Sequence, residues 1–420
     1  MPLPSKKLLI INYAFPPYPG IGGRRWAKFS KHLQQAGYEI FVISSHNPFN
    51  KISDWTKDTG NVKLSQLPLY YPKSLITYPK GTIGKIEYRL AKMKVKLFSK
   101  GNYYDRSIFW KKQLLDKASK IIQEHQIETL IVSAAPFRLL QHCANLKKDF
   151  PNLKLIADIR DPWTNNHTSY GFETMSKSRL KFEQATESSV FNFYNKVITV
   201  SETISTYFKI LYPQTKEKFL TIENGYDADE MKLQFDETLH FDKEKINLVF
   251  TGSFYSKADY LFRELIASML NGGLEKLQFY FFGDGSSRLS RMLPDTLKHQ
   301  FVFGEYNKVE QVNSLIERAD YAMLFLSDDI NYSLSTKFCE YIKFKKKILV
   351  FSKPGYTGDY IEKHGIGFQL NPQNMHECLL NITSGNLELN QFPTSFNLEL
   401  FSVKRLTGKL IEVIEGKDAN

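Results

Sequence analysis

A short segment in the second half of the chain combines residue types that bind a diphosphate: Ser335, Thr336, Lys337 and, one turn later, Glu340. Ser and Thr are favoured helix N-caps, so the segment predicts a loop that enters a helix. The amides of a helix start and the Lys337 ammonium attract an anion, and Glu340 can accept hydrogen bonds from ribose hydroxyls. The alternative is an ordinary capping box, in which Ser or Thr stands three or four residues before Glu.

Two turns with small residues stand earlier in the same half of the chain. Each follows an apolar run, the first over 247–251 and the second over 278–282. Glycine lets a backbone approach a ligand closely, although glycine after a strand is also common turn chemistry. The residues of these turns that we expect to contact the same ligand are Gly252, Gly283, Asp284 and Gly285.

A Pro- and Gly-rich loop opens the first predicted helix, which covers residues 24–35. Helix N-termini favour anions, and glycines admit a ligand. The spacing is not G-x-G-x-x-G and no acidic residue stands near Ser44, so the loop does not predict an NAD site. The alternative is a merely flexible first loop, which the paired prolines disfavour because they stiffen the backbone. The candidate ligand contacts here are Gly20, Gly22, Gly23 and Arg24.

Charged residues also stand at the end of the apolar run 153–158. Asp158, Arg160 and Asp161 are followed by Trp163, and such a cluster at the carboxyl end of a strand can hold the hydroxyls of an acceptor. Asp161 is the candidate acceptor-side carboxylate. The alternative is a cluster of caps and salt bridges that braces the next loop.

Short apolar runs separated by helical patterns surround these segments and predict two doubly wound α/β domains, which are Rossmann-like. A polar stretch over 224–245 marks the hinge. We predict domains over 1–235 and 236–397, and a helix with a tail over 398–420 that closes the second domain or crosses back to the first. The carboxyl ends of both sheets should face a central cleft. The predicted strands are 7–12, 39–44, 127–133, 153–158 and 196–200, then 247–251, 278–282, 301–303, 321–325 and 347–351.

Composition excludes several classes of protein. The chain has 420 residues, of which 42% are hydrophobic and 24% charged, so it is too long for one ordinary domain and is not disordered. Three widely separated cysteines and nine histidines show no metal-ligand spacing, so we predict no metal site and a reducing, cytoplasmic location. No run approaches the roughly 18 apolar residues that span a bilayer.

The formal net charge of +12 is concentrated in residues 80–112, a basic amphipathic helix pattern. Such a helix suits contact with an anionic membrane surface, and the alternative is a helix packed on its own domain. The charge also raises the possibility of nucleic-acid binding, but the lysines cluster on one helix and no RNA-binding fingerprint occurs. The basic residues are Lys85, Arg89, Lys92, Lys94, Lys96 and Lys100, and they alternate with Ile86, Leu90, Met93, Val95, Leu97 and Phe98.

Taken in order, these segments resemble the family 4 glycosyltransferases. The resemblance implies a GT-B fold and a nucleotide-diphosphate sugar as donor substrate, with no metal or other cofactor. It also implies transfer with retention to a glycan or lipid-linked acceptor, in the assembly of surface polysaccharide or glycolipid. The matching segments, spread from about residue 7 to 370, are the PP-x-x-G-x-GG-RR loop, D-x-RDPW, VITVS (197–201), IENGY (222–226), the TG-S and GDG turns, and STKFCEY.

The resemblance also assigns residues. The diphosphate-binding helix start falls on Ser335, Thr336 and Lys337, and the ribose-binding glutamate on Glu340. The base pocket should include the turn 283–285 and Tyr306, while Gly20, Gly22 and Gly23 should border the donor phosphates and the acceptor.

The chain departs from the family pattern at two places. The position of the first glutamate of E-x7-E holds Tyr332, which leaves the sugar-reading carboxylate open. The Arg and Lys that usually follow the first strand of the second domain are shifted, and only Lys257 remains there to share with Lys337 the neutralisation of the leaving diphosphate. A GT-B-fold epimerase or phosphorylase is the alternative enzyme.

Overall fold

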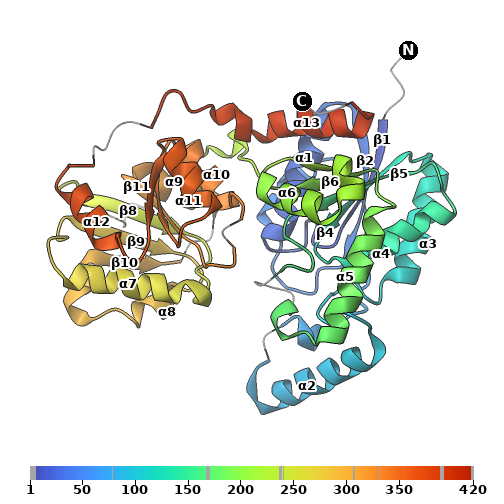
Figure 1. Cartoon of the computed structure of the whole chain (residues 1–420), viewed down its shortest axis with the longest axis horizontal. Coiled ribbons are helices and arrows are strands. Elements are labelled where there is room, and N and C mark those ends of the chain that lie inside the picture. Colours follow the sequence, from blue (N-terminus) through green and yellow to red (C-terminus); the bar gives the residue numbers. More distant parts are fainter. Residues whose placement is uncertain are drawn as a thin grey trace. The chain divides into compact units, whose positions relative to one another are not determined.

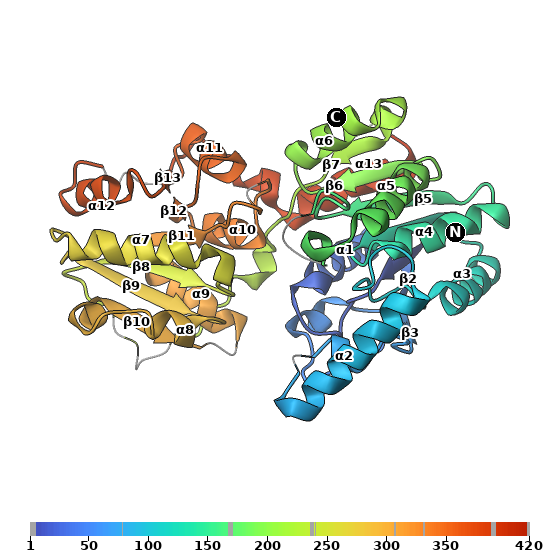
Figure 2. The same ribbon diagram turned by 60° about the horizontal axis from the view of Figure 1, so that its bottom comes forward.

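The computed structural model describes residues 6–77, 79–166, 171–235, 239, 241–305, 308–330, 332–387 and 392–417. Tyr306, predicted to contact a base, lies outside these residues. The chain forms two compact units, the first from Met1–Glu223 and Leu406–Asn420 and the second from Asn224–Arg405 (Figure 1). Each unit has its own parallel sheet with helices on both faces, as the sequence predicts (Figure 2).

The first unit has a seven-stranded parallel sheet in the order β3-β2-β1-β4-β5-β6-β7. The chain leaves β1 in one direction and resumes on its other side at β4, which makes the carboxyl ends of these two strands the topological switch point. The strands are β1 Lys6–Asn12, β2 Tyr38–Ser45, β3 Lys63–Leu67, β4 Thr129–Ala134, β5 Lys154–Ile159, β6 Lys196–Thr199 and β7 Phe219–Thr221.

Helix α1 begins at the predicted residue, and it ends one residue before Ala36 and two before Gly37, which has a left-handed φ of 85°. The predicted basic helix over 80–112 is shorter in the structure, because α2 ends at Phe98 and a loop separates it from α3. The helices of this unit are α1 Arg24–Gln35, α2 Gly81–Phe98, α3 Lys111–His125, α4 Arg138–Ala144, α5 Lys177–Phe191 and α6 Glu202–Leu211.

The second unit repeats the arrangement with six parallel strands in the order β10-β9-β8-β11-β12-β13. Its switch point lies between β8 and β11. The strands are β8 Ile246–Thr251, β9 Leu277–Phe282, β10 Phe301–Gly304, β11 Tyr321–Phe325, β12 Lys347–Phe351 and β13 Gly367–Leu370. The helices are α7 Asp259–Leu270, α8 Ser286–Ser290, α9 Val309–Arg318, α10 Thr336–Lys343, α11 Tyr356–Lys363 and α12 Met375–Thr383.

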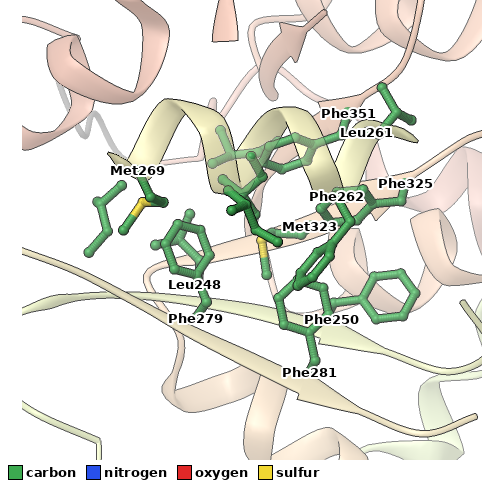
Figure 3. Packing of buried hydrophobic residues seen from close by; sticks show 14 of the residues in the cluster. Leu248, Phe250, Leu261, Phe262, Met269, Phe279, Phe281, Met323, Phe325 and Phe351 are labelled. Atoms are coloured by element: carbon green, nitrogen blue, oxygen red, sulfur yellow. The ribbon is translucent and has the colours of Figure 1, made fainter. Parts of the chain in front are cut away.

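The core of the second unit is unusually rich in phenylalanine. Figure 3 shows Phe262 on α7 above Phe250 and Phe281 of the sheet. Phe325 and Phe351, on neighbouring strands, stack with their ring centroids 4.3 Å apart. Large rings in close-packed contact hold the strands firmly, so the loops that follow β8 and β9 stand on a rigid base.

The first unit ends at Glu223 rather than at the predicted residue 235, because the next segment is hydrogen-bonded to the second unit. The amide of Tyr226 donates to the carbonyl of Phe401 at 2.9 Å, and Asn313 Nδ2 donates to the carbonyl of Glu230 at 2.6 Å. The polar composition of this segment therefore reflects hydrogen bonding to the second unit.

The helix predicted to open the segment 398–420 is divided into a 3₁₀ helix, Leu398–Phe401, and α13, Val403–Glu415. From Leu406 onward α13 belongs to the first unit. Its last turn is capped there by Lys154, whose Nζ donates to the carbonyls of Val413 at 2.7 Å and Ile414 at 2.9 Å.

Candidate functional site

The start of α10 lies in the second unit and has the predicted N-cap. Ser335 has extended backbone angles, and its Oγ accepts the amide of Phe338 at 3.2 Å. Phe338 therefore occupies the third helical position, and Glu340 lies two residues further along the helix. A reciprocal capping box needs a Glu or Gln at the third position, so the alternative interpretation of this segment does not hold.

The loop before α10 is held by a segment distant in the sequence. Asn224, from the IENGY segment, donates its Nδ2 to the carbonyl of Leu334 at 3.3 Å. The carbonyl of Asn224 in turn accepts from Cys339 Sγ at 3.3 Å. The helix start is thus fixed from both sides, which gives an anion site the rigidity that preorganised binding requires.

Lys337 lies beside the loop that follows β8. Its Nζ donates to the carbonyl of Ser253 at 2.9 Å and stands 4.1 Å from the ring centroid of Phe250. Desolvation lowers the pKa of Lys337 to about 7, although the carboxylate of Glu340 acts in the opposite direction. A bound anion would restore the ammonium form, because an opposite charge favours the charged state.

Gly252 makes room for this lysine. It has a φ of 99°, and a Cβ atom there would lie 2.6 Å from Lys337 Cε. Both the backbone angle and the space therefore require glycine. The TG-S turn and the lysine segment, which the sequence assigns to one ligand, are thus adjacent in the structure, with Lys337 packed across Gly252.

The turn after β9 joins the same loop. Ser253 Oγ donates to Asp284 Oδ2 at 3.0 Å, and the amide of Phe254 donates to the carbonyl of Asp284 at 2.8 Å. Gly283 and Gly285 have φ values of 124° and 98°. The loops after β8 and β9 are therefore one hydrogen-bonded layer at the carboxyl edge of the sheet, where open α/β sheets bind ligands.

Arg288, a residue that sequence reasoning missed, adds a cation to this layer. Its Nη2 donates to the carbonyl of Phe254 at 2.9 Å, and its Nη1 pairs with Asp259. Arg288 stands three residues after Gly285, in the short helix α8, so its place in the first turn after the GDG segment was the available signal.

Lys257, predicted to act together with Lys337, has a different neighbour. Its Nζ lies 2.6 Å from Asp329 Oδ2, in the loop that follows β11. Burial alone would raise the pKa of Asp329, but hydrogen bonds from Lys257 and Ser327 lower it. The adjacent Asp328 is paired separately, with Lys353 at 2.6 Å and with the hydroxyl of Tyr260 at 2.6 Å.

The remaining residues predicted to bind the donor are only partly covered. Thr336 and Glu340 are half-buried, and so is Tyr332, which stands at the position of the family's first glutamate. Glu340 acts on Lys337 through its charge. The contacts of Thr336 with a diphosphate and of Glu340 with a ribose remain predictions.

At the carboxyl edge of the first unit, Arg160, which directly follows β5, contacts the end of β4 and the loop before α1. Its Nη1 donates to the carbonyl of Gly22 at 3.1 Å and its Nε to that of Ala134 at 3.5 Å, so the loop before α1 is linked to the ends of β4 and β5. A Cβ atom at Gly23 would lie 2.3 Å from the carbonyl oxygen of Ala14. Gly23 therefore serves the close folding of its own loop.

Asp158 is fully buried, which corrects its prediction as a residue that touches an acceptor. Its carboxylate accepts from Arg25 Nε at 3.1 Å, Trp26 Nε1 at 2.8 Å and Ser133 Oγ at 3.3 Å. Arg24 is buried as well, at 3% exposure. Asp158 was predicted to contact a ligand because it stands at a strand end, and Arg24 because it opens a helix, yet both side chains pack inside the unit. Asp161 is half-buried and stays a candidate.

Arg25 makes the buried carboxylate part of a larger brace. It donates to the carbonyls of Glu223 at 2.6 Å and Ile222 at 2.8 Å in addition to Asp158. Desolvation lowers the pKa of Arg25, and the charge of Asp158 opposes that shift. This network fixes α1 to β5 and to the segment after β7. For Asp158 the structure therefore agrees with the alternative interpretation, a cluster of salt bridges that supports the fold.

Within the described ranges, no group of three or more His, Cys, Asp or Glu side chains could hold a metal ion. The same part of the chain contains no helix of the length and apolar character needed to cross a membrane. Cys143, Cys339 and Cys378 carry reduced thiols.

No family model and no curated protein matches the sequence. Several solved structures resemble the fold over nearly the whole chain. A glycosyltransferase from Rickettsia africae ESF-5 has a TM-score of 0.64 and 14% identity, and covers 99% of both chains. The sucrose-phosphate synthase from Thermosynechococcus elongatus has a TM-score of 0.68 and 10% identity, and covers 98% of both.

A third similar structure carries a different activity in its name. It is a putative UDP-N-acetylglucosamine 2-epimerase from Listeria monocytogenes, with a TM-score of 0.55, 8% identity and 98% coverage of both chains. At identities of 8–14% these likenesses concern the fold. They confirm the predicted GT-B fold, with its two parallel-sheet units.

Proposed function

We propose that this chain is a glycosyltransferase that moves a sugar from a nucleotide-diphosphate donor to a glycan or lipid-linked acceptor. The donor diphosphate binds to the second unit, between the loop 252–253 and the start of α10. The order of the sequence motifs together with the GT-B fold supports family 4 and transfer with retention of anomeric configuration.

One observation carries the proposal: a desolvated lysine lies at the start of a helix on the carboxyl edge of a Rossmann-like sheet. Lys337 has a pKa of about 7 because burial disfavours its ammonium form. Holding such an amine without a ligand costs folding free energy, which is characteristic of a site built for a partner. An anion at the helix start supplies the missing stabilisation.

The chemistry follows from the charge that develops during transfer. When the bond between the sugar and the diphosphate breaks, negative charge grows on the leaving oxygen. The ammonium of Lys337 and the amides at the start of α10 stabilise that charge, which is the main requirement for the step. No metal cofactor enters this proposal, since lysine and amides neutralise the leaving group.

The other predicted residues take supporting roles in this proposal. Glu340 binds the ribose, and Gly283 and Gly285 with Asp284 border the base. Lys257 approaches the diphosphate after leaving Asp329, which now pairs with it. In the first unit, Arg160, Gly22 and Asp161 face the acceptor. Asp158 acts only by positioning α1.

Assembly of surface polysaccharide or glycolipid is the process that suits a lipid-linked acceptor. The three reduced cysteines favour a cytoplasmic location, because thiols stay reduced there.

The first experiment screens a panel of nucleotide sugars by thermal shift and then measures release of the nucleoside diphosphate with and without candidate acceptors. A transferase releases the nucleoside diphosphate in step with a glycosylated acceptor. No stabilisation by any nucleotide sugar, and no release with any acceptor, would contradict the proposal.

The likeness to the epimerase structure favours a second candidate, a sugar-nucleotide epimerase. Product analysis separates the two. An epimerase converts the sugar nucleotide into its stereoisomer without an acceptor, whereas the proposed transferase leaves the donor's configuration unchanged until an acceptor is added.

A further inference from the structure

Helix α2 carries a continuous row of apolar side chains that point to solvent. Their spacing of three and four residues places them along one side of the helix. In an ordinary amphipathic helix of a folded domain, the apolar side is the buried side. The row and its exposed fractions are Ile83 76%, Ile86 51%, Leu90 56%, Met93 63% and Leu97 77%.

The other side of α2 packs on the first unit. Val95 is 1% exposed and clusters with Tyr71 and Tyr103, while the hydroxyls of Tyr88 and Tyr104 lie 3.3 Å apart. At 3.6 residues per turn, Val95 and Tyr88 stand opposite the apolar row. Packing on its own unit, the alternative offered by the sequence, therefore accounts for Val95 and leaves the apolar row unexplained.

The helix is also fixed at its end. Arg179 of α5 donates through Nη1 to the carbonyls of Ser99 at 3.0 Å and Gly101 at 2.7 Å, and through Nη2 to that of Lys96 at 2.5 Å. Figure 1 shows α2 along the outside of the first unit, away from its sheet. The row is thus presented on a rigid, convex element instead of in a groove.

Basic residues border the apolar row. Lys85, Arg89 and Lys96 stand along one flank by the helical period, and Lys94 stands on the other. Helix α2 contains five basic residues and one acidic residue, Glu87, which gives it a net charge of +4. A second copy of this chain would bring the same positive charge against it, so self-association through α2 is disfavoured.

We propose that α2 docks the first unit onto an anionic lipid bilayer. The helix lies in the plane of the interface, with the apolar row immersed among the acyl chains and the flanking Lys and Arg side chains on the acidic head groups. We identify the partner as a bilayer because its surface offers both environments that α2 requires. The acyl chains suit the exposed apolar side chains, and the acidic head groups suit the flanking cations. This docking is independent of the donor site.

The test is sedimentation of the full chain with lipid vesicles, in the absence of any donor. The wild type should bind vesicles of phosphatidylcholine with about 30% phosphatidylglycerol, bind pure phosphatidylcholine at least about tenfold more weakly, and release at high salt. A triple variant, Ile86→Ser/Leu90→Ser/Met93→Ser, should lose about tenfold or more of its binding. Because all three side chains are exposed, its melting temperature should stay near that of the wild type.

Control variants on other helices distinguish binding by α2 from binding by any exposed apolar or basic side chain. Ile210→Ser removes an equally apolar side chain, 75% exposed on α6 of the same unit, and should bind vesicles like the wild type. Lys85→Glu/Arg89→Glu should weaken binding to anionic vesicles more than Lys117→Glu/Lys120→Glu on α3, which makes the same change of charge.

A second readout reports the depth of the helix. In a Met93→Trp variant, brominated acyl chains should quench the added fluorescence well beyond the quenching of the wild type. Equal vesicle binding by the triple serine variant would overturn the proposal. So would a dimer in light scattering that the triple variant abolishes, because that result assigns α2 to a protein interface.

Discussion

The carboxyl edges of the two sheets are built with the same strand order but differ in how their charges are used. In the first unit, Asp158 and Arg25 form a buried ion pair, and the guanidinium of Arg160 donates hydrogen bonds to backbone carbonyls. In the second unit, Lys337 is held by one carbonyl and one aromatic ring, and its pKa falls to about 7. A charged residue at the carboxyl edge of a sheet can therefore stabilise the fold or be available to bind a ligand. Which of the two it does depends on its burial and on its partners.

The largest effect that we expect from a single substitution is a loss of stability in the first unit. Asp158→Ala leaves the guanidinium of Arg25 buried without its carboxylate, which should cost about 3–5 kcal/mol of unfolding free energy. All four tryptophans, Trp26, Trp55, Trp110 and Trp163, belong to the first unit, so their fluorescence during urea unfolding reports on that unit.

The matched variant is Asp161→Ala, which removes a half-buried carboxylate three residues away and should cost about 1 kcal/mol or less. Equal losses in the two variants would show that Asp158 is not the brace described here.

In the second unit, Gly252→Ala should weaken donor binding about tenfold, because the new methyl group displaces the Lys337 side chain. Gly272→Ala is the control, since it has a similar φ of 83° but meets nothing within 4 Å. Both variants should lose roughly 1 kcal/mol of stability. Donor titration by calorimetry separates them, and equal affinities would argue against a site at Gly252.

The depressed pKa of Lys337 predicts a pH dependence. A nucleotide sugar has no group that titrates near neutrality, so the lysine sets the profile. Below pH about 7 the amine is protonated and binds the donor well; as the pH rises through 7, affinity should fall, by up to about tenfold per pH unit. Lys337→Arg keeps its charge and should flatten the profile between pH 6 and about 9. An identical slope in both proteins would exclude Lys337 as its source.

The smallest expected effect concerns Lys257. Asp329→Asn removes the partner that now holds this lysine, and should tighten donor binding about two- to fivefold if Lys257 moves to the diphosphate. Asp328 lies in the same loop as Asp329 and pairs with Lys353. Asp328→Asn disturbs that pair and should leave the donor affinity unchanged. Weaker binding in Asp329→Asn would mean that the pair supports the site as it stands.

Most of the fold could be predicted from the sequence, because strands buried on both faces of a parallel sheet are continuous apolar runs. The three strands that were missed lack that signal. β3 reads KLSQL with only Leu67 buried, β7 has three residues, and β13 contains Gly367 in four residues.

The site was predictable only in part, since its meaning depends on contacts distant in the sequence. The N-cap at Ser335 is local and was found. Lys337 donates to Ser253, which is 84 residues away in the sequence, and Asp158 accepts from Arg25, which is 133 residues away. The basic pattern of α2 was likewise visible, but the sequence did not show that Val95 is buried and the other apolar side chains are not.

The most direct test of the proposed donor site is the dissociation constant of the nucleotide sugar that gives the largest thermal shift, measured by calorimetry at pH 6.5 for three proteins. We expect Lys337→Ala to bind about 100-fold more weakly than the wild type, a loss of roughly 3 kcal/mol. Lys298→Ala, which removes an exposed lysine paired with Asp295 in the same unit, should bind like the wild type. Equal affinity in Lys337→Ala and the wild type would contradict the proposal that Lys337 holds the diphosphate.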